Sequence, residues 1–296
     1  MSKNRLRGPA LALMLAPAFG ACSNGSSTTG DSKDMADAPP ADMASPTATD
    51  MASPPVFCSG GTLTKAQDSQ FVGSWAIQSK VTQSQDVPGI GPKESTITTL
   101  SFADFKLDGQ NQLVMTQKDC RITSTGVPGI STVTIADAVP QTTPSSTAAV
   151  KVCDTAGTLS WQRDQATVLV GCKLADPINT PLPTMPNDAA VFDQDGDGKV
   201  GITIKIGGTF PGTSGDLYTV QRQRFSYTST ALPSAGKANG TTLDRSEQNT
   251  LDATNQLLKQ KVTLNAVDAK STFRLAKITG ITTCTDLINQ SATLFP

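Results

Sequence analysis

Apolar and polar residues alternate along much of the chain, and the alternation is clearest near residue 200. From Val200 to Ile206 every second residue is valine or isoleucine, while Gly201, Thr203 and Lys205 occupy the positions between them. A repeat of two residues is the pattern of a half-buried β-strand. Shorter runs of the same kind, rich in threonine and bounded by glycine, proline and aspartate, recur from residue 73 onwards,.

These runs predict a series of short strands without a convincing helix. The segment 246–259 has a weak stripe of leucines, but Thr250 and Thr254 disfavour a helix there,. The expected strands lie near residues 73–83, 94–107, 111–124, 130–139, 147–153, 165–173, 199–208, 216–228, 247–256, 260–267 and 271–279. Such a series favours an all-β fold, a single antiparallel β-barrel or sandwich.

Two tryptophans are expected in the core of this fold. Aromatic side chains bury large areas, and only Tyr218 and Tyr227 could extend Trp75 or Trp161 into a ligand-stacking surface,. The run Gly73-Ser74-Trp75 resembles the Gly-x-Trp that opens lipocalin barrels, in which the tryptophan closes one end. That resemblance implies a lipocalin-like barrel as one form of the predicted fold.

Composition excludes several common chemistries. The chain has no histidine, which removes Ser-His-Asp and Cys-His mechanisms and histidine-ligated zinc,. With 24 Lys plus Arg against 25 Asp plus Glu it also has no electrostatic footprint for nucleic acid,. We expect a non-enzymatic protein that binds no nucleic acid. A glycosidase or peptidase acting through carboxylates alone stays open, and would need two acids converging in a cleft.

The N-terminus has the pattern of an export signal. Three basic residues before position 8 precede an apolar stretch over 9–19, which is too short to span a bilayer,. The run Phe19-Gly20-Ala21-Cys22 then resembles the lipobox of bacterial lipoprotein precursors. That resemblance implies a signal peptide at 1–21, removal before Cys22, and acylation of Cys22. An ordinary secretory signal cut near Ala21 is the alternative.

The segment after the lipobox predicts a tether. Residues 22–56 are almost wholly small, polar or proline, with an Asp-Met-Ala unit repeated every eight residues, and cannot bury enough surface to fold,. We therefore expect a lipidated cysteine and disordered tether over 22–56 and a single all-β domain over 57–296. In the bacterial lipoproteins that this pattern resembles, a serine directly after the cysteine permits transfer to the outer membrane, and this chain has Ser23 there. The partners implied are the membrane, through the lipid anchor, and an unknown protein or small apolar ligand.

Five cysteines remain if Cys22 is acylated, and an exported chain tends to pair them. We expect Cys153 to pair first with Cys172, because both flank a predicted turn around Asp164. Cys120 with Cys284 is the second expected bridge. Cys58 would be left free.

One run of residues has the pattern of a metal loop. Asp193, Asp195 and Asp197 stand at positions 1, 3 and 5, glycine stands at position 6, and Lys199 offers a backbone carbonyl at position 7. This spacing resembles the calcium loops of EF-hands, dockerins and thrombospondin-type repeats, where oxygen ligands wrap one ion. Ile204 stands where an EF-hand needs glutamate, so the loop is not an EF-hand.

The resemblance implies a structural calcium ion. Asp188, or a residue from another loop, could replace the missing ligand. At the weak affinities of extracellular sites, about 0.1 to 1 mM, millimolar calcium would stabilise the fold by about 0.4 to 1.4 kcal/mol. A solvated Asp/Gly turn without an ion is the alternative.

Arg222 and Arg224 fall on one side of a predicted strand,. A solvated strand face is the expected role, with an anion or lipopolysaccharide contact as the alternative. The calcium-type loop, the threonine-rich strands and the closing segment 283–296 together are similar to uncharacterised predicted lipoproteins of myxobacterial type. We therefore expect a lipid-anchored envelope protein with a structural or binding role, or alternatively a lipocalin-like carrier of a small apolar ligand.

Overall fold

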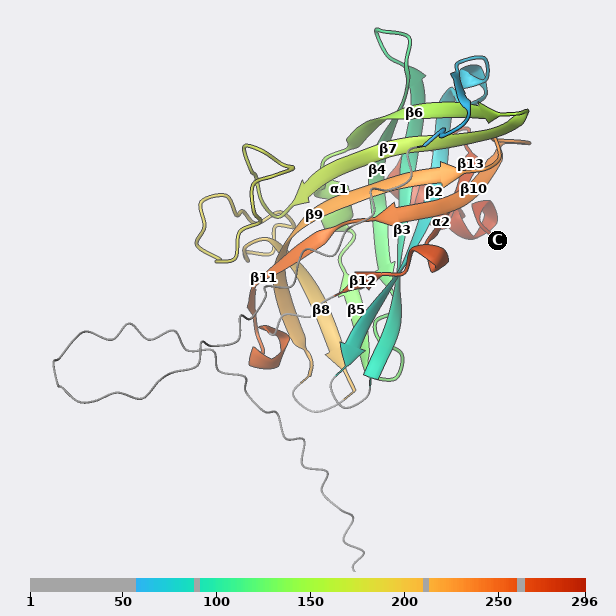
Figure 1. The fold of residues 1–296 in the computed structure, drawn as a ribbon. Coiled ribbons are helices and arrows are strands. Elements are labelled where there is room, and N and C mark those ends of the chain that lie inside the picture. Colours follow the sequence, from blue (N-terminus) through green and yellow to red (C-terminus); the bar gives the residue numbers. More distant parts are fainter. Residues whose placement is uncertain (1–56, 88–90, 210–212, 260–263) are drawn as a thin grey trace, which may run out of the picture. The chain divides into compact units, whose positions relative to one another are not determined.

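The computed structural model describes residues 57–87, 91–209, 213–259 and 264–296, which form one compact unit (Figure 1). The expected signal peptide at 1–21, Cys22 and the expected tether over 22–56 lie outside the described residues.

All thirteen strands of the described residues belong to one sheet, and every pairing between them is antiparallel. The strands are β1 (Thr62–Thr64), β2 (Gly73–Val87), β3 (Gly91–Leu107), β4 (Leu113–Ser124), β5 (Ser131–Ile135), β6 (Ser146–Thr155), β7 (Thr158–Val170), β8 (Ile202–Gly208), β9 (Gly215–Ser229), β10 (Lys237–Asp244), β11 (Glu247–Ala253), β12 (Asn265–Ala266) and β13 (Thr272–Lys277). The helical elements are α1 (Ala138–Thr142), α2 (Cys284–Leu294) and the 3-10 turns η1 (Asp68–Gln70), η2 (Gln256–Lys259) and η3 (Asp268–Lys270).

The sheet closes on itself. Strands pair in the order β6, β7, β9, β10, β13, β2, β3 and β4, and β4 then pairs back with β6 at Gln117 and Ser146. Because a closed ring leaves no free edge between these strands, it forms a barrel. The expected all-β antiparallel fold is confirmed.

Two long strands extend the sheet beyond the ring. β4 continues to pair with β5, and the first half of β9 pairs with β8 and β11 (Figure 1). Between these extensions lies a second apolar cluster that includes Val168 and Ile204, and α1 covers it through Val139. The alternation around residue 200 therefore builds this cluster, since Ile202 and Ile204 are buried there.

Aromatic side chains fill the barrel. Trp75 and Trp161 are 1% and 0% exposed, which confirms both as core residues. Trp161 packs edge-on against Phe71 and Phe273, with ring centroids 5.4 and 5.3 Å apart. The Trp75 indole N–H donates to the Phe71 carbonyl at 2.6 Å, which satisfies the polar end of that ring,.

The structure departs from the expected elements in several places. The segment 130–139 is a strand only as far as Ile135 and then turns into α1, while β10 and the short β1 were not expected. The expected strand over 260–267 is described only from residue 264, where β12 occupies two positions. The segment 246–259 forms β11 and a short 3-10 turn, which confirms the prediction against a long helix.

The C-terminal helix α2 is the largest departure. It packs on the outside of the barrel, where Leu287 and Phe295 meet Ala76, Leu100 and Ile278. The Thr283 side chain caps its first turn by accepting from the Asp286 N–H, so the sequence did contain a helix start signal,.

The disulfides correct one of the two expected pairings. Cys120–Cys284 is present, with Cα atoms 5.1 Å apart, and ties α2 to β4. Cys153 pairs with Cys58, not with Cys172, which is a buried free thiol. The turn after Cys153 falls near residue 157 rather than at Asp164, so Cys153 lies opposite Ser160. Cys172 follows twelve residues later, about 40 Å along an extended strand.

Candidate functional site

The three aspartates of the metal-type pattern lie in the long connection between β7 and β8. This connection, residues 171–201, folds back on itself, because Cys172 bridges to Val191 and Asp193 bridges to Gly201. Its leucines and valines pack against Val220 and Leu251 of β9 and β11. The connection is therefore anchored to the sheet at both ends and in the middle.

Backbone geometry makes the tight turn that brings the aspartates together. Gly196 and Gly198 have φ values of +73° and +82°, in the left-handed region that favours glycine,. Their N–H groups donate to the two carboxylate oxygens of Asp193, each at 2.8 Å. Asp193 thus organises the turn from its first position.

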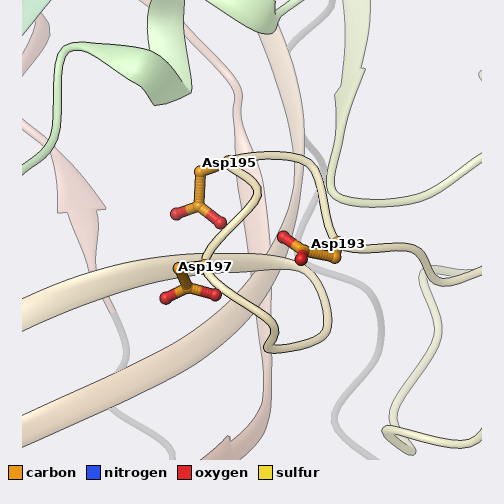
Figure 2. Close-up of side chains that lie close together, drawn as sticks. All are labelled: Asp193, Asp195 and Asp197. Carbon is orange, nitrogen blue, oxygen red and sulfur yellow. The ribbon is translucent and has the colours of Figure 1, made fainter.

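The carboxylates of Asp193, Asp195 and Asp197 converge. One oxygen from each lies within 4.8 Å of the others, and Figure 2 shows the Asp193 and Asp195 carboxylates facing one another across the turn. Thr203, at the start of β8, ties two of them together. Its N–H donates to Asp195 at 2.9 Å and its hydroxyl donates to Asp197 at 2.6 Å.

The cluster is negative without a neighbouring counterion. Among the ion pairs of the described residues, none involves these three carboxylates. Burial raises the pKa of Asp195, and the charges of Asp197 and Asp193 raise it further, while the Thr203 N–H lowers it. The Asp195 Oδ1 atom is buried and accepts no hydrogen bond from the described residues. A cation at this point would relieve both the repulsion and the unsatisfied oxygen.

The other expected ligands are less well placed. Asp188 is outside the cluster, and its carboxylate accepts from the Ala190 N–H at 2.8 Å. The Lys199 N–H donates to Asp197, and its ammonium lies 6.0 Å from the centre of the Tyr218 ring. The carbonyl of Lys199 as a ligand stays a prediction. Ile204 is buried in β8, so position 12 supplies no ligand.

Gln194 holds the loop in place, a role that no pattern in the sequence indicated. It is 9% exposed, and its side-chain oxygen accepts from the Gly171 N–H at 2.6 Å. Its amide donates to the Thr143 hydroxyl at 3.0 Å, just after α1. The aspartate loop is therefore fastened to the end of β7 and to α1 by one residue.

Arg222 and Arg224 also hold the connection. Arg222 is 3% exposed, pairs with Glu247 at 2.5 Å, and donates to the carbonyl of Thr180. Arg224 donates to the carbonyl of Ile178. The expected solvated strand face is wrong for Arg222, because the connection folds over β9 and supplies acceptors that no local pattern reveals.

The site offers hard oxygen ligands and little else. Carboxylate oxygens at alternate loop positions suit calcium, which takes six to eight oxygen ligands in flexible geometry. The one free thiol nearby, Cys172, is buried, and burial raises the pKa of that thiol. A raised pKa lowers the thiolate fraction and thus the reactivity. The arrangement can bind a cation, and it presents no activated nucleophile.

The barrel, its two disulfides and the aspartate loop define a disulfide-bridged β-barrel protein with a candidate metal site. No family model, curated protein or solved structure matches the chain. Among the described residues, no helix is both long enough and apolar enough to cross a membrane.

Proposed function

We propose that this chain is a lipid-anchored protein of the bacterial outer membrane whose β-barrel has a structural or binding role and no enzymatic one. One calcium ion stabilises the loop of Asp193, Asp195 and Asp197. The observation that carries the proposal is the convergence of three carboxylates for which the described residues supply no counterion and, at one buried oxygen of Asp195, no donor.

Calcium fits the chemistry of this loop. The ligand atoms are carboxylate oxygens, which magnesium and calcium prefer, and no histidine or thiolate joins them to favour zinc or copper,. The loop closes through glycine N–H groups and not through a rigid octahedral cage. Magnesium demands near-ideal octahedral geometry, whereas calcium accepts irregular sets of oxygen ligands, so a loop of this kind favours calcium over magnesium.

The cysteines support an exported location. Cys58–Cys153 and Cys120–Cys284 join parts of the chain 95 and 164 residues apart. Disulfides of this kind persist in oxidising compartments and are rare in the cytosol. Together with the lipobox pattern ending at Cys22, they support anchoring in the cell envelope.

A lipocalin-like carrier of a small apolar ligand has less support. Its barrel would enclose an apolar cavity, whereas Trp75, Trp161 and Phe273 belong to one buried cluster inside this barrel. Two surface hollows of the described residues, of 290 and 460 Å³, are lined by residues other than these tryptophans. The aromatic packing inside the barrel supports the structural or partner-binding role.

Replacement of Cys22 tests the anchor. We expect the full chain expressed in a Gram-negative host to incorporate labelled palmitate and to fractionate with the outer membrane, whereas Cys22→Ser should do neither. Cys172→Ser is the control, because it changes a buried free thiol outside the lipobox. If the Cys22→Ser protein stays in the membrane fraction and neither form carries label, the chain is held there by another means and the anchor is excluded.

A further inference from the structure

A layer of polar side chains lies inside the barrel, next to the aromatic cluster. Asp119 accepts from Ser101 at 2.7 Å and from Gln117 at 3.0 Å. The Tyr227 phenol donates to Gln117 at 3.1 Å. These four side chains are all buried and satisfy one another.

Arg163, in the same layer, is not satisfied. It is 0% exposed, and only Nη2 finds acceptors, the Ser146 hydroxyl at 2.8 Å and the Ser146 carbonyl at 3.4 Å. Nε and Nη1 have no acceptor among the described residues. No described carboxylate lies within ion-pair distance of Arg163. A guanidinium stays protonated in proteins, so its charge is buried without a counterion in contact, and the Asp119 and Asp164 carboxylates act on it only from beyond ion-pair distance,.

Two aromatic rings flank this charge, but they do not replace the hydrogen-bond acceptors that it lacks. The Arg163 guanidinium carbon lies 5.5 Å from the centre of the Phe225 ring and 5.7 Å from that of Tyr227. Ring faces attract a cation, but a ring face is a weak substitute for an oxygen or halide acceptor in the plane of the guanidinium. The N–H groups on Nε and Nη1 therefore still lack acceptors.

The unsatisfied groups lie close together in the sheet register. Arg163 is directly opposite Tyr227 on β9, and Tyr227 is opposite Thr242 on β10, so all three side chains share one face,. The hydroxyl of Thr242 is buried without a partner, as is the indole N–H of Trp161, two residues before Arg163. The groups in this row that lack partners are thus hydroxyl or N–H donors.

We propose that Arg163 binds a small monovalent anion of the halide class inside the barrel, with Thr242 able to donate to it. An anion supplies the missing acceptor and places a negative charge in contact with the guanidinium, which Asp119 and Asp164 do not. A water molecule would supply only the acceptor. This site is separate from the calcium loop, and neither proposal depends on the other.

Anion-dependent unfolding of the full chain tests the site. In sodium chloride, compared with sodium gluconate at the same ionic strength, we expect the wild-type Tm to rise saturably by about 2 to 5 °C. Arg163→Met should abolish the difference. Arg274→Met is the matched control, because Arg274 also stacks on an aromatic ring, Phe295, but on the outside of the barrel. An equal Tm in both salts, or a chloride effect that survives Arg163→Met, would overturn the proposal.

Diffraction from wild-type crystals grown in sodium bromide gives a second test that needs no variant to fold. We expect a bromine anomalous peak within hydrogen-bond distance of Nε or Nη1 of Arg163. Density for water alone at those atoms would show that solvent satisfies Arg163 and that no anion site exists.

Discussion

Tyr227 is buried at the centre of the barrel, and its environment makes ionisation costly. Burial raises the pKa of its phenol from 10.0 to about 12, although the Arg163 charge nearby lowers it. Above pH 10 the unfolded chain therefore loses the Tyr227 proton while the folded chain keeps it. Since folding then retains a proton that the unfolded state has released, stability falls as the pH rises from 10 to about 12,.

Tyr227→Phe should remove this part of the pH dependence. We expect the unfolding free energy of the wild type to fall between pH 10 and pH 11.5 more steeply than that of Tyr227→Phe, on average by about 1 kcal/mol per pH unit. The variant also removes a donor to Gln117, but that changes the level of the curve and not its slope. Urea unfolding at a series of alkaline pH values measures both curves. Parallel curves would show that Tyr227 ionises equally in both states.

Residue roles could be predicted where they depend on local spacing alone. The convergence of Asp193, Asp195 and Asp197 follows from their alternate positions around glycine, and this spacing was sufficient to predict it. The roles of Gln194 and Arg163 depend on partners 23 and 17 residues away. No pattern within a window of the sequence reveals such partners.

The connection between β7 and β8 is the element that carries the candidate metal site. It is held at one end by Gln194, at Gly171 and Thr143, and elsewhere by the arginines of β9. These hydrogen bonds hold the loop in place without the help of an ion. A pre-organised loop loses less conformational entropy on binding, so we expect the anchoring residues to contribute to the affinity for the proposed ion.

Gln194→Ala should therefore weaken both the fold and calcium binding. The Gly171 N–H would be left buried without its acceptor, which costs about 1 to 3 kcal/mol of unfolding free energy,. Calorimetric titration should give a larger calcium Kd than for the wild type. Gln110→Ala, in the exposed turn between β3 and β4, is the control and should change stability by no more than about 0.5 kcal/mol,. Unchanged stability and affinity in Gln194→Ala would contradict the anchoring role.

Strands were more predictable than the helix. Alternation located most strands of the ring, because each has one face inside the barrel and one outside. The helix α2 packs only through a narrow apolar stripe that includes Leu287 and Ile288, so its periodicity is weak and its cap at Thr283 was the better signal. β10 was missed because small and polar residues fill most of its length.

The two disulfides connect distant parts of the described unit. Cys58–Cys153 fixes the start of the unit to β6, and Cys120–Cys284 fixes its last helix to β4. Cross-links over separations of 95 and 164 residues restrict the unfolded chain strongly,. The pairing of Cys58 could not be predicted, because it depends on β1 lying beside β6, a contact that only the closed sheet defines.

Peptide mapping without reduction should recover both bridges and a free Cys172. Replacing Cys58 and Cys153 together by alanine should lower the unfolding free energy by about 2 to 5 kcal/mol, measured by urea unfolding. Alkylation of Cys172 should require unfolding, since its thiol is buried. A recovered Cys153–Cys172 peptide would contradict the closed-barrel register.

The proposed stabilisation by calcium concerns the whole molecule, and thermal unfolding of the full chain tests it most directly. With 1 mM calcium in place of a chelator, at constant ionic strength, the wild-type Tm should rise by about 1 to 5 °C. Asp195→Asn should unfold at a higher temperature than the wild type in chelator, because it removes like-charge repulsion, and should gain little from calcium. A wild-type Tm that is the same with calcium and with chelator would contradict the claim and leave the loop a solvated turn.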